Sequence, residues 1–284
     1  MSISGGIKLF DKSKNLLVDG ATISSSISGD ASAEYAIDRS KITYFRSVGT
    51  DDSTQEILLI DWGEAKTIDR ILLLDHNFKL FDVYYDSNGS QNWTAFTSAV
   101  GLDGAIGGGS ISETTFADNT AYYEVDSVTA YGLRIRCTET QTTDAEKYLN
   151  QAIATVEIGT FIGFPTCNIT SDRKLSIREV LNGRSSVAKK NEVFVYELIL
   201  NEYPANSNYN TDITLIENLH DREDPFIIWP CGGRRGSTYF PYAARGHRLK
   251  DAIQVQILSP LSPIYSSGVY INPISINMTM RESE

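Results

Sequence analysis

Cysteine is scarce in this chain of 284 residues, and its few copies are widely spaced. Cys137, Cys167 and Cys231 form no Cys-x-x-Cys pair, which argues against both a disulfide framework and a zinc site. The odd count predicts folding in a reducing compartment. Long apolar runs are lacking too: no stretch approaches the roughly 18 residues of a membrane-spanning helix, so membrane insertion is not expected.

Motifs that carry catalysis are also missing. The sequence holds no Gly-x-Ser-x-Gly, no His-Glu-x-x-His, no phosphate-binding loop and no Gly-x-Gly-x-x-Gly that leads into a suitable helix. His76, His220 and His247 lie far apart and have no nucleophile motif beside them. Adjacent carboxylates such as Asp51 and Asp52 exist, but spacing alone does not place them across a substrate. The sequence therefore predicts a protein that is not an enzyme.

Positive charge is in deficit, because 25 Lys and Arg face 36 Asp and Glu, for a net charge of −11. Phosphate backbones and anionic lipids repel such a chain, so nucleic acid is not an expected partner. A basic cluster in the second half leaves two interpretations open, an anion site or charge that is solvated or interfacial. It comprises Arg234, Arg235, Arg245, His247 and Arg248.

Aromatic residues are plentiful, with 15 Tyr and 11 Phe, and apolar residues make up 41% of the chain, which is enough for a core. Short apolar runs bounded by turn residues predict strands in the first half, at residues 56–61, 67–74, 80–85, 122–125, 132–137 and 153–158. Six such strands indicate an antiparallel sandwich or jelly roll.

A stretch with Gly and Pro, from Gly159 to Pro165, divides the chain, and strand patterning restarts after it. Alternating apolar residues predict strands at 194–200, 253–257 and 274–280, and a short helix is predicted from Thr211 to Leu219. We therefore predict a mainly all-β chain of two domains, residues 1–162 and 163–284. The second is expected to be a β-sandwich with that helix.

Four segments of the first half carry a resemblance when they are taken in order: residues 36–47, 55–71, 81–93 and 153–159. Together they make residues 15–162 resemble the discoidin, or coagulation-factor type C, family of galactose-binding-like jelly rolls. The chain departs from the family pattern at Arg39, where Gly is usual, at Phe45, where Trp is usual, and at Trp62, where Leu is usual. A core absorbs the two apolar replacements, whereas Arg39 disfavours a backbone conformation that Gly would allow.

The resemblance implies a structural Ca²⁺ site in the first of these segments, and no other cofactor is expected. Asp38, Thr43 and Glu157 would supply side-chain oxygens, which suit that hard cation. The alternative is that Asp38 and Thr43 close a turn through local hydrogen bonds.

The resemblance also implies ligand binding by loops at one end of the jelly roll, where relatives bind sugars or lipid head groups. A sugar site needs exposed aromatic rings beside polar side chains. Tyr44, Tyr122 and Tyr123 are the candidate rings for a glycan. The alternative is that these tyrosines lie on strands and belong to the core.

The second half resembles phage distal tail and tail hub proteins at the level of pattern only. The resemblance covers residues 165–284 and rests on residues 182–200, 211–219, 224–230 and 274–280, which predict a long strand, a helix, a Pro-flanked strand and a final pair of strands. Such proteins form rings, so the second domain would make the self-association surface and the first would lie outside it.

Together the two resemblances predict a structural component of a bacteriophage tail, in the distal tail or tail tip region. It would form a ring homo-oligomer in the virion, after assembly in the bacterial host cytoplasm. Its neighbours would be tail tube, hub or fibre proteins, and the jelly roll would contact fibres or host glycans. The alternative is a carbohydrate-binding protein whose main task is glycan capture.

Overall fold

The computed structural model describes residues 7–10, 16–17, 20–26, 33–38, 40, 42–49, 51–101, 104–105, 109–155, 159–161, 165–180, 184–201, 226–229, 253–258, 262–264 and 275–282. Strands dominate these residues, with a short 3-10 helix, η2 (Ala33–Ala36). The predicted all-β fold class is confirmed. The predicted helix at 211–219 and the basic cluster at 234–248 lie outside the described residues.

The chain divides into two compact units, of which one comprises Met1–Ile158 with Trp229–Ala252 and the other Gly159–Ile228 with Ile253–Glu284. The first break falls at the predicted Gly- and Pro-containing stretch. The finer domain boundary predicted at 162/163 stays a prediction.

The first unit is built on a ten-stranded sheet with the order β3-β11-β4-β10-β5-β6. In addition β2 pairs with β4, β7 with β10, β8 with β7, and β9 with β5. The strands are β2 (Thr22–Ser25), β3 (Phe45–Arg46), β4 (Glu56–His76), β5 (Phe78–Asp86), β6 (Trp93–Ala95), β7 (Val100–Gly101), β8 (Gly104–Ala105), β9 (Ser112–Glu113), β10 (Thr120–Thr140) and β11 (Tyr148–Thr155).

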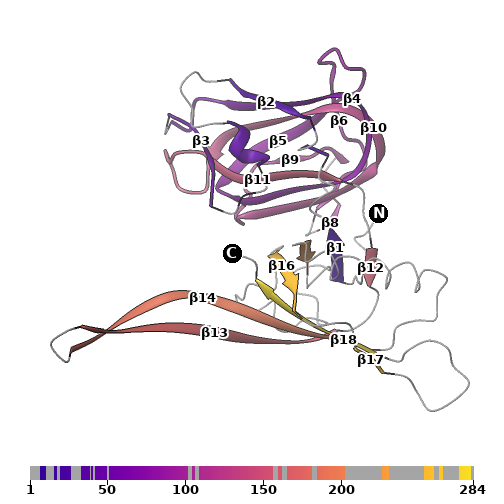
Figure 1. Cartoon of the computed structure of the whole chain (residues 1–284). Helices are drawn as coiled ribbons and strands as arrows, with labels where there is room; N and C mark the ends of the chain where they lie inside the picture. The colour runs from indigo at the N-terminus through magenta and orange to yellow at the C-terminus, as the bar shows by residue number, and fades with distance from the viewer. Residues whose placement is uncertain are drawn as a thin grey trace, which may run out of the picture. The chain divides into compact units, whose positions relative to one another are not determined.

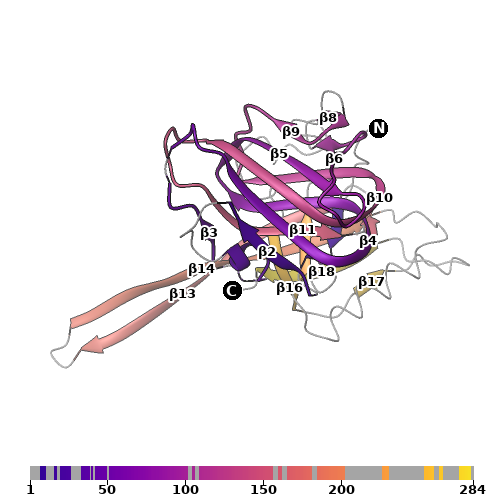
Figure 2. The ribbon, with the colours of Figure 1, turned by 90° about the horizontal axis from the view of Figure 1, so that it is seen from above.

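The two long strands β4 and β10 run antiparallel and bend together (Figures 1 and 2). The first part of β4, residues 56–61, pairs with residues 132–137 of β10, and its second part, residues 66–74, pairs with 120–130. On one side of the bend, β2 and β5 extend the sheet, and on the other side β11 and β7 do so. The single sheet therefore folds over into the two layers of a jelly roll.

The core lies between these layers and follows from the period-2 pattern of the strands. Leu58, Ile60 and Trp62 are buried, while Ile57 and Leu59 between them are only half-buried. Phe45, which stands where the resembling family has Trp, is fully buried. Removing a Leu or Ile from such a core destabilises a protein by about 2–5 kcal/mol.

The backbones of β4 and β10 approach each other closely at the bend. The register of β10 shifts between Ala130 and Gly132, and the indole N–H of Trp62 donates to the carbonyl oxygen of Ala130 at 2.9 Å. A Cβ atom on Gly132 would lie 2.4 Å from the carbonyl oxygen of Ile60. Gly is therefore required at this position by the close approach of the two backbones.

The buried imidazole of His76 ends strand β4 inside a cluster of aromatic rings. Its ring centroid lies 5.1 Å from that of Phe78, 5.6 Å from Phe81 and 5.4 Å from Phe116. Its Nδ1 atom accepts a hydrogen bond from the Phe78 N–H at 3.1 Å, and Nε2 has no hydrogen-bond partner. Burial lowers the pKa of His76 to about 3, so the ring is neutral in the folded protein.

A buried carboxylate shapes the turn between β5 and β6. Asp86 Oδ1 accepts hydrogen bonds from the backbone N–H groups of Asn88, Gly89 and Asn92 at 3.1, 3.1 and 3.2 Å. Its Oδ2 atom accepts from the N–H of Gln91 at 2.8 Å. One side chain thus satisfies four backbone donors of the turn and places Trp93 at the start of β6.

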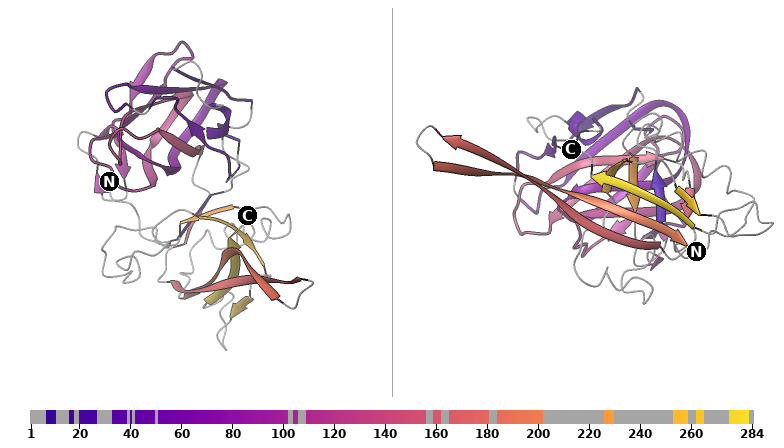
Figure 3. Two further views of the ribbon diagram at one scale, coloured as in Figure 1. Left: turned by 90° about the vertical axis from the view of Figure 1, so that its left-hand side faces the viewer. Right: turned by 60° about the horizontal axis from the view of Figure 1, so that its bottom comes forward.

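The other sheet has eight strands in the order β12-β1-β15-β16-β18-β14-β13, and β17 pairs with β18. These strands are β1 (Ile7–Phe10), β12 (Gly159–Phe161), β13 (Pro165–Val180), β14 (Arg184–Asn201), β15 (Phe226–Trp229), β16 (Ile253–Ile257), β17 (Ser262–Ile264) and β18 (Ser275–Glu282). Figure 3 shows β13 and β14 as one long hairpin, paired from Pro165 with Leu200 to Val180 with Arg184. The strands predicted near 194–200, 253–257 and 274–280 are confirmed.

Replacing Gly132 with Ala is expected to lower the free energy of unfolding by about 1–3 kcal/mol, because the new methyl group forces the backbones of β4 and β10 apart. Chemical denaturation checks this. Gly49→Ala is the matched control, since a Cβ atom there has no atom within 4 Å and the residue has no positive φ. Equal stability of the two variants would contradict the argument.

Replacing His76 with Asn is expected to flatten the acid side of the stability profile. The folded pKa of about 3 lies below the usual 6.5, so the unfolded chain takes up a proton first as the pH falls. The wild type therefore loses stability as the pH falls below 6.5, by roughly 1.4 kcal/mol per pH unit at most, until about pH 3. Asn retains an acceptor for the Phe78 N–H but does not titrate. Urea denaturation of both proteins from pH 7 to 4.5 measures the difference in slope, and parallel profiles would refute it.

Candidate functional site

Three connections meet at one end of the jelly roll, and hydrogen bonds hold them together. They are the β3–β4 connection (residues 47–55), the β4–β5 turn around Asn77, and the β10–β11 connection (residues 141–147). The Asn77 side chain joins two of them: its Nδ2 group donates to the carbonyl oxygen of Glu146 at 2.7 Å, and its Oδ1 accepts from the N–H of Tyr148 at 2.9 Å. The loops at this end therefore form one braced assembly.

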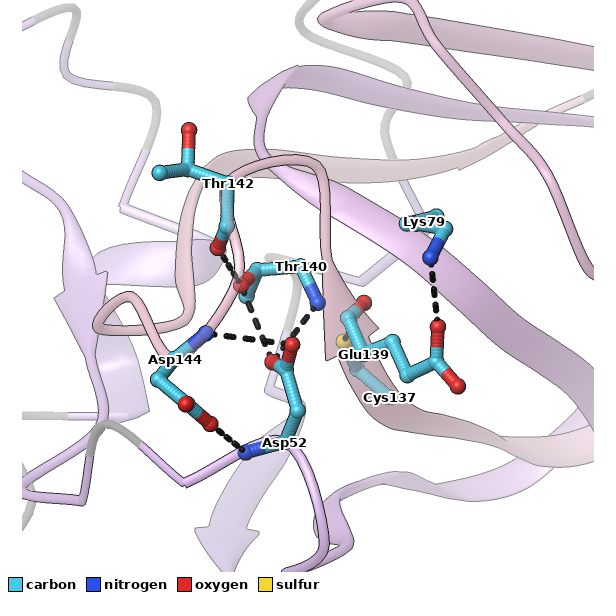
Figure 4. A network of polar contacts seen from close by, with 7 residues as sticks. All are labelled: Asp52, Lys79, Cys137, Glu139, Thr140, Thr142 and Asp144. Carbon is cyan, nitrogen blue, oxygen red and sulfur yellow. Dashed lines mark hydrogen bonds and ion pairs between the residues drawn. The ribbon is translucent and has the colours of Figure 1, made fainter.

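Asp52 makes the second brace, between the β3–β4 connection and the end of β10 (Figure 4). Its carboxylate accepts from the N–H of Thr140 and from the N–H of Asp144, both at 3.1 Å, and Asp144 Oδ1 accepts from the N–H of Asp52 at 3.2 Å. Partial burial would raise the pKa of Asp52, but the hydrogen bonds from Asp144 and Thr140 outweigh it and lower that pKa. The carboxylate thus stays ionised as a structural acceptor.

Lys147 makes the third brace from inside the domain. Its side chain is buried, and Nζ donates to the carbonyl oxygen of Asp51 at 2.8 Å. Its backbone N–H donates to Ser47 Oγ at 2.9 Å, and the N–H of Ser47 donates back to the Lys147 carbonyl oxygen at 2.9 Å. This pairing fixes the strand ends that carry the residues described next.

An aromatic and charged surface lies on these braced strands, and we call it the Tyr44 patch: Tyr44, Arg46, Asp75, Glu146 and Tyr148. Tyr44 and Tyr148 are half-buried, with centroids 5.8 Å apart and planes at 81°. The Arg46 guanidinium carbon lies 5.5 Å from the Tyr44 centroid and 5.8 Å from the Tyr148 centroid. Arg46 Nη1 bonds Glu146 Oε2 at 2.7 Å, and their side chains are 47% and 40% exposed.

Asp75 holds Tyr44 in place by accepting a short hydrogen bond from its hydroxyl group. The backbone of Asp75 has a φ of 48°, a left-handed conformation that Asp tolerates better than most residues. Burial and this hydrogen bond raise the pKa of Tyr44 to about 12, and burial together with the charge of Asp75 raises that of Tyr148. Both phenols therefore stay protonated at neutral pH.

The Tyr44 patch offers ring surfaces, a cationic donor and two carboxylates within one half-exposed surface. Such a set can stack on an apolar ring face and exchange hydrogen bonds with hydroxyl groups around that ring. The ion pair and the ring contacts hold the side chains in place before a ligand arrives, which reduces the entropy that binding must overcome.

The structure places the three candidate glycan tyrosines in different environments. Tyr44 lies in the patch. Tyr122 and Tyr123 are buried, 2% and 1% exposed, and their hydroxyl groups donate to Glu124 Oε1 and Glu113 Oε1 at 3.0 Å. A glycan cannot stack on rings that the core covers, so the prediction at Tyr122 and Tyr123 is wrong and the core alternative holds for both.

For calcium, the structure shows the local hydrogen bonds of the alternative interpretation. Asp38 accepts from the Ser40 N–H at 2.8 Å and from the Thr43 hydroxyl at 2.6 Å. The carbonyl oxygens of Ser40 and Thr43 accept from the side-chain amide of Asn150 at 3.1 and 2.6 Å, and that of Ser40 also from Gln151 at 2.7 Å. Both Asp38 oxygens and the Thr43 hydroxyl are thus engaged in local hydrogen bonds, which do not fit Ca²⁺ ligands. Glu157 and Arg39 lie outside the described residues, so a calcium site that includes Glu157 stays a prediction.

Other acidic, His and Cys groups give no metal site either: within the part of the chain that the structure describes, no three of them gather around a common point. The thiol of Cys137 is buried, and burial raises its pKa above the usual range. It therefore acts as a core residue.

Arg46, Asp75, Glu146 and Tyr148 were not anticipated as site residues. Arg46 alternates with buried Phe45 along a strand, which is a usable sequence signal. Asp75 and Glu146 carry none, because they meet their partners Tyr44 and Arg46 across 31 and 100 positions of sequence.

No protein-family model and no curated protein matches the chain. Among solved structures, it is similar to a chitosan-binding module of a chitosanase/glucanase from Paenibacillus sp. IK-5, at 17% identity over 49% of this chain and 97% of the module, with a TM-score of 0.40. It is also similar to a family 32 carbohydrate-binding module of C. perfringens NanJ, at 14% identity over 52% of this chain and 98% of the module, with a TM-score of 0.37. A fucosidase from Bacteroides thetaiotaomicron matches at 16% identity and a TM-score of 0.41, over 52% of this chain and 29% of the enzyme.

Likeness at this level does not decide which ligand the chain binds. The comparisons lend no support to a role in a phage tail. In the described residues, no helix is long and apolar enough to cross a membrane.

Replacing Asp52 with Ala is expected to lower the free energy of unfolding by about 1–3 kcal/mol, because the N–H groups of Thr140 and Asp144 lose their acceptor. Thermal or urea unfolding measures the change. Asp126→Ala is the control, since Asp126 is exposed and no described group bonds its carboxylate. A loss no larger than that of the control would show that the Asp52 brace is not needed.

Proposed function

We propose that this protein is a carbohydrate-binding protein that captures glycans, without chemical turnover, at the Tyr44 patch. The observation that carries the proposal is the combination of half-exposed Tyr44 and Tyr148 with Arg46, Asp75 and Glu146 on braced strand ends. Apolar ring faces supply contact area, while the charged groups around them exchange strong hydrogen bonds with sugar hydroxyl groups.

The charges of the patch favour a neutral or amino sugar over an acidic one. Asp75 and Glu146 contribute two negative charges, against one positive charge on Arg46. A carboxylate or sulfate brought to this surface would meet net negative charge at short range. Galactose and chitotriose are suitable first probes, because the C. perfringens NanJ module was solved with galactose and a second chitosan-binding module of the Paenibacillus enzyme, also similar to this chain, was solved with chitotriose.

The sequence also predicted a ring-forming component of a phage tail, and glycan binding at the Tyr44 patch is independent of that prediction. Of the two functions left open by the sequence, the Tyr44 patch favours glycan capture. Glycan capture at a host surface would serve either setting, so the proposal does not depend on ring formation.

Replacing Tyr148 with Ala is expected to reduce affinity for the bound sugar at least tenfold, because one of the two rings is lost. Isothermal titration calorimetry with galactose and chitotriose checks this, after a glycan array if neither binds. Tyr35→Ala is the control, since Tyr35 is an exposed tyrosine (40%) outside the patch. Sugar binding that survives Tyr148→Ala unchanged would place the site elsewhere, and no binding to any neutral or amino sugar would refute the proposal.

A further inference from the structure

A second aromatic and charged surface lies on the outer face of the layer that holds β5, β6 and the end of β10. We call it the Arg134 face: Asp82, Tyr84, Trp93, Arg134 and Arg136. Arg134 pairs in register with Tyr84, and Arg136 with Asp82. All five side chains are half-buried. Asp82, Tyr84, Arg134 and Arg136 alternate along their strands with buried residues such as Val83, Leu133 and Ile135, so they share the face that points away from the core. Trp93 lies on the same face, because it pairs in register with Asp86 of β5.

Arg136 has its charge satisfied within the face. Its Nε donates to Asp82 Oδ1 at 2.6 Å, and its Nη2 donates to Asp82 Oδ2 at 2.5 Å and to the Tyr84 hydroxyl oxygen at 3.1 Å. This is a two-pronged pair between a guanidinium and a carboxylate, which fixes both groups in position.

Arg134 forms no ion pair of its own within the face. Its guanidinium carbon lies 4.6 Å from the centroid of Tyr84 and 5.3 Å from that of Trp93, so two rings hold it. Its Nε atom is buried and has no hydrogen-bond partner, and no described carboxylate forms an ion pair with it. Burial, and next the neighbouring charge of Arg136, lower the pKa of Arg134, and the charge of nearby Asp82 offsets this only in part.

We infer that the Arg134 face binds an acidic sugar, with the sugar carboxylate paired to Arg134 and the pyranose ring against Trp93. A guanidinium held beside two rings can present its remaining N–H groups as the fork that matches a carboxylate. Asp82 is occupied by Arg136, so it leaves Arg134 free to take the ligand. The proposal does not rest on the function of the Tyr44 patch.

A sugar fits this face better than an acidic peptide does. The strands β5 and β10 are both paired on two sides, β10 with β4 and β5, and β5 with β10 and β6. The face therefore offers no free strand edge at Arg134 for a peptide backbone to join. The chain's net charge of −11 opposes anions at long range, but salt screens such charge beyond about 8 Å.

The test uses the full chain and a matched pair of probes, methyl glucuronide and methyl glucoside, which differ in one carboxylate. Calorimetry gives the affinities, and the indole N–H resonance of Trp93, assigned with Trp93→Phe, reports the place of binding. We expect methyl glucuronide to bind at least ten times more tightly than methyl glucoside and to shift the Trp93 resonance. Arg134→Gln should reduce the glucuronide affinity at least tenfold, and Arg134→Lys, which keeps the charge but not the fork, several-fold. Lys66→Gln removes a positive charge elsewhere on the unit and should change nothing.

Three outcomes would overturn the proposal. Equal affinity for the two probes would mean that the sugar carboxylate does not contribute to binding. Unchanged glucuronide affinity in Arg134→Lys, which retains the positive charge, would mean that the guanidinium fork is not used. Equal or tighter binding of acetate or of a Glu-rich peptide would mean that the face is a general carboxylate site or a peptide site rather than a sugar site.

Discussion

The pairing of β4 with β10 is the interaction on which the rest of the first unit depends. Both strands are 21 residues long, and each belongs to both layers, so their shared bend sets how the layers face each other. The bend is possible because Gly132 lets the backbone of β10 approach Ile60, and because Trp62 supplies the donor for the carbonyl oxygen of Ala130. A register shift elsewhere in either strand would turn core residues to the surface, since side chains alternate between faces.

The same two strands position both candidate binding surfaces and give them opposite charge. The end of β4 supplies Asp75 to the Tyr44 patch, where two carboxylates face one guanidinium. The second part of β10 supplies Arg134 and Arg136 to the other surface, where two guanidinium groups face one carboxylate. Each surface also carries two aromatic rings. In both proposals the rings would supply a stacking partner, and the local charge would select between neutral or amino sugars and acidic ones.

The sequence predicted the structure correctly where it follows from a local residue pattern. It was misleading where tertiary contacts determine whether a side chain is buried. The apolar run at residues 56–61 predicted the first part of β4, because a short apolar run bounded by turn residues is a local property of a strand. The choice of Tyr122 and Tyr123 as candidate glycan rings failed, because the run from Thr120 to Val125 is buried on both faces. Adjacent tyrosines then look amphipathic in sequence but are both covered. The sequence could not identify Asp75 and Glu146 as the partners of Tyr44 and Arg46, because only the tertiary fold brings these residues together.

Carboxylates in the loops of this acidic chain serve mainly as acceptors for backbone N–H groups. Asp38, Asp52 and Asp86 each bond at least one such donor, and Asp86 bonds four. An ionised carboxylate accepts these bonds more strongly than a neutral oxygen does. A cluster of acidic loop residues therefore need not indicate a metal site: the charge is already used to hold the loops. Because hydrogen bonds fix the loops in this way, the rings and charged groups of the Tyr44 patch lie on an ordered support, which would lower the entropic cost of the proposed binding.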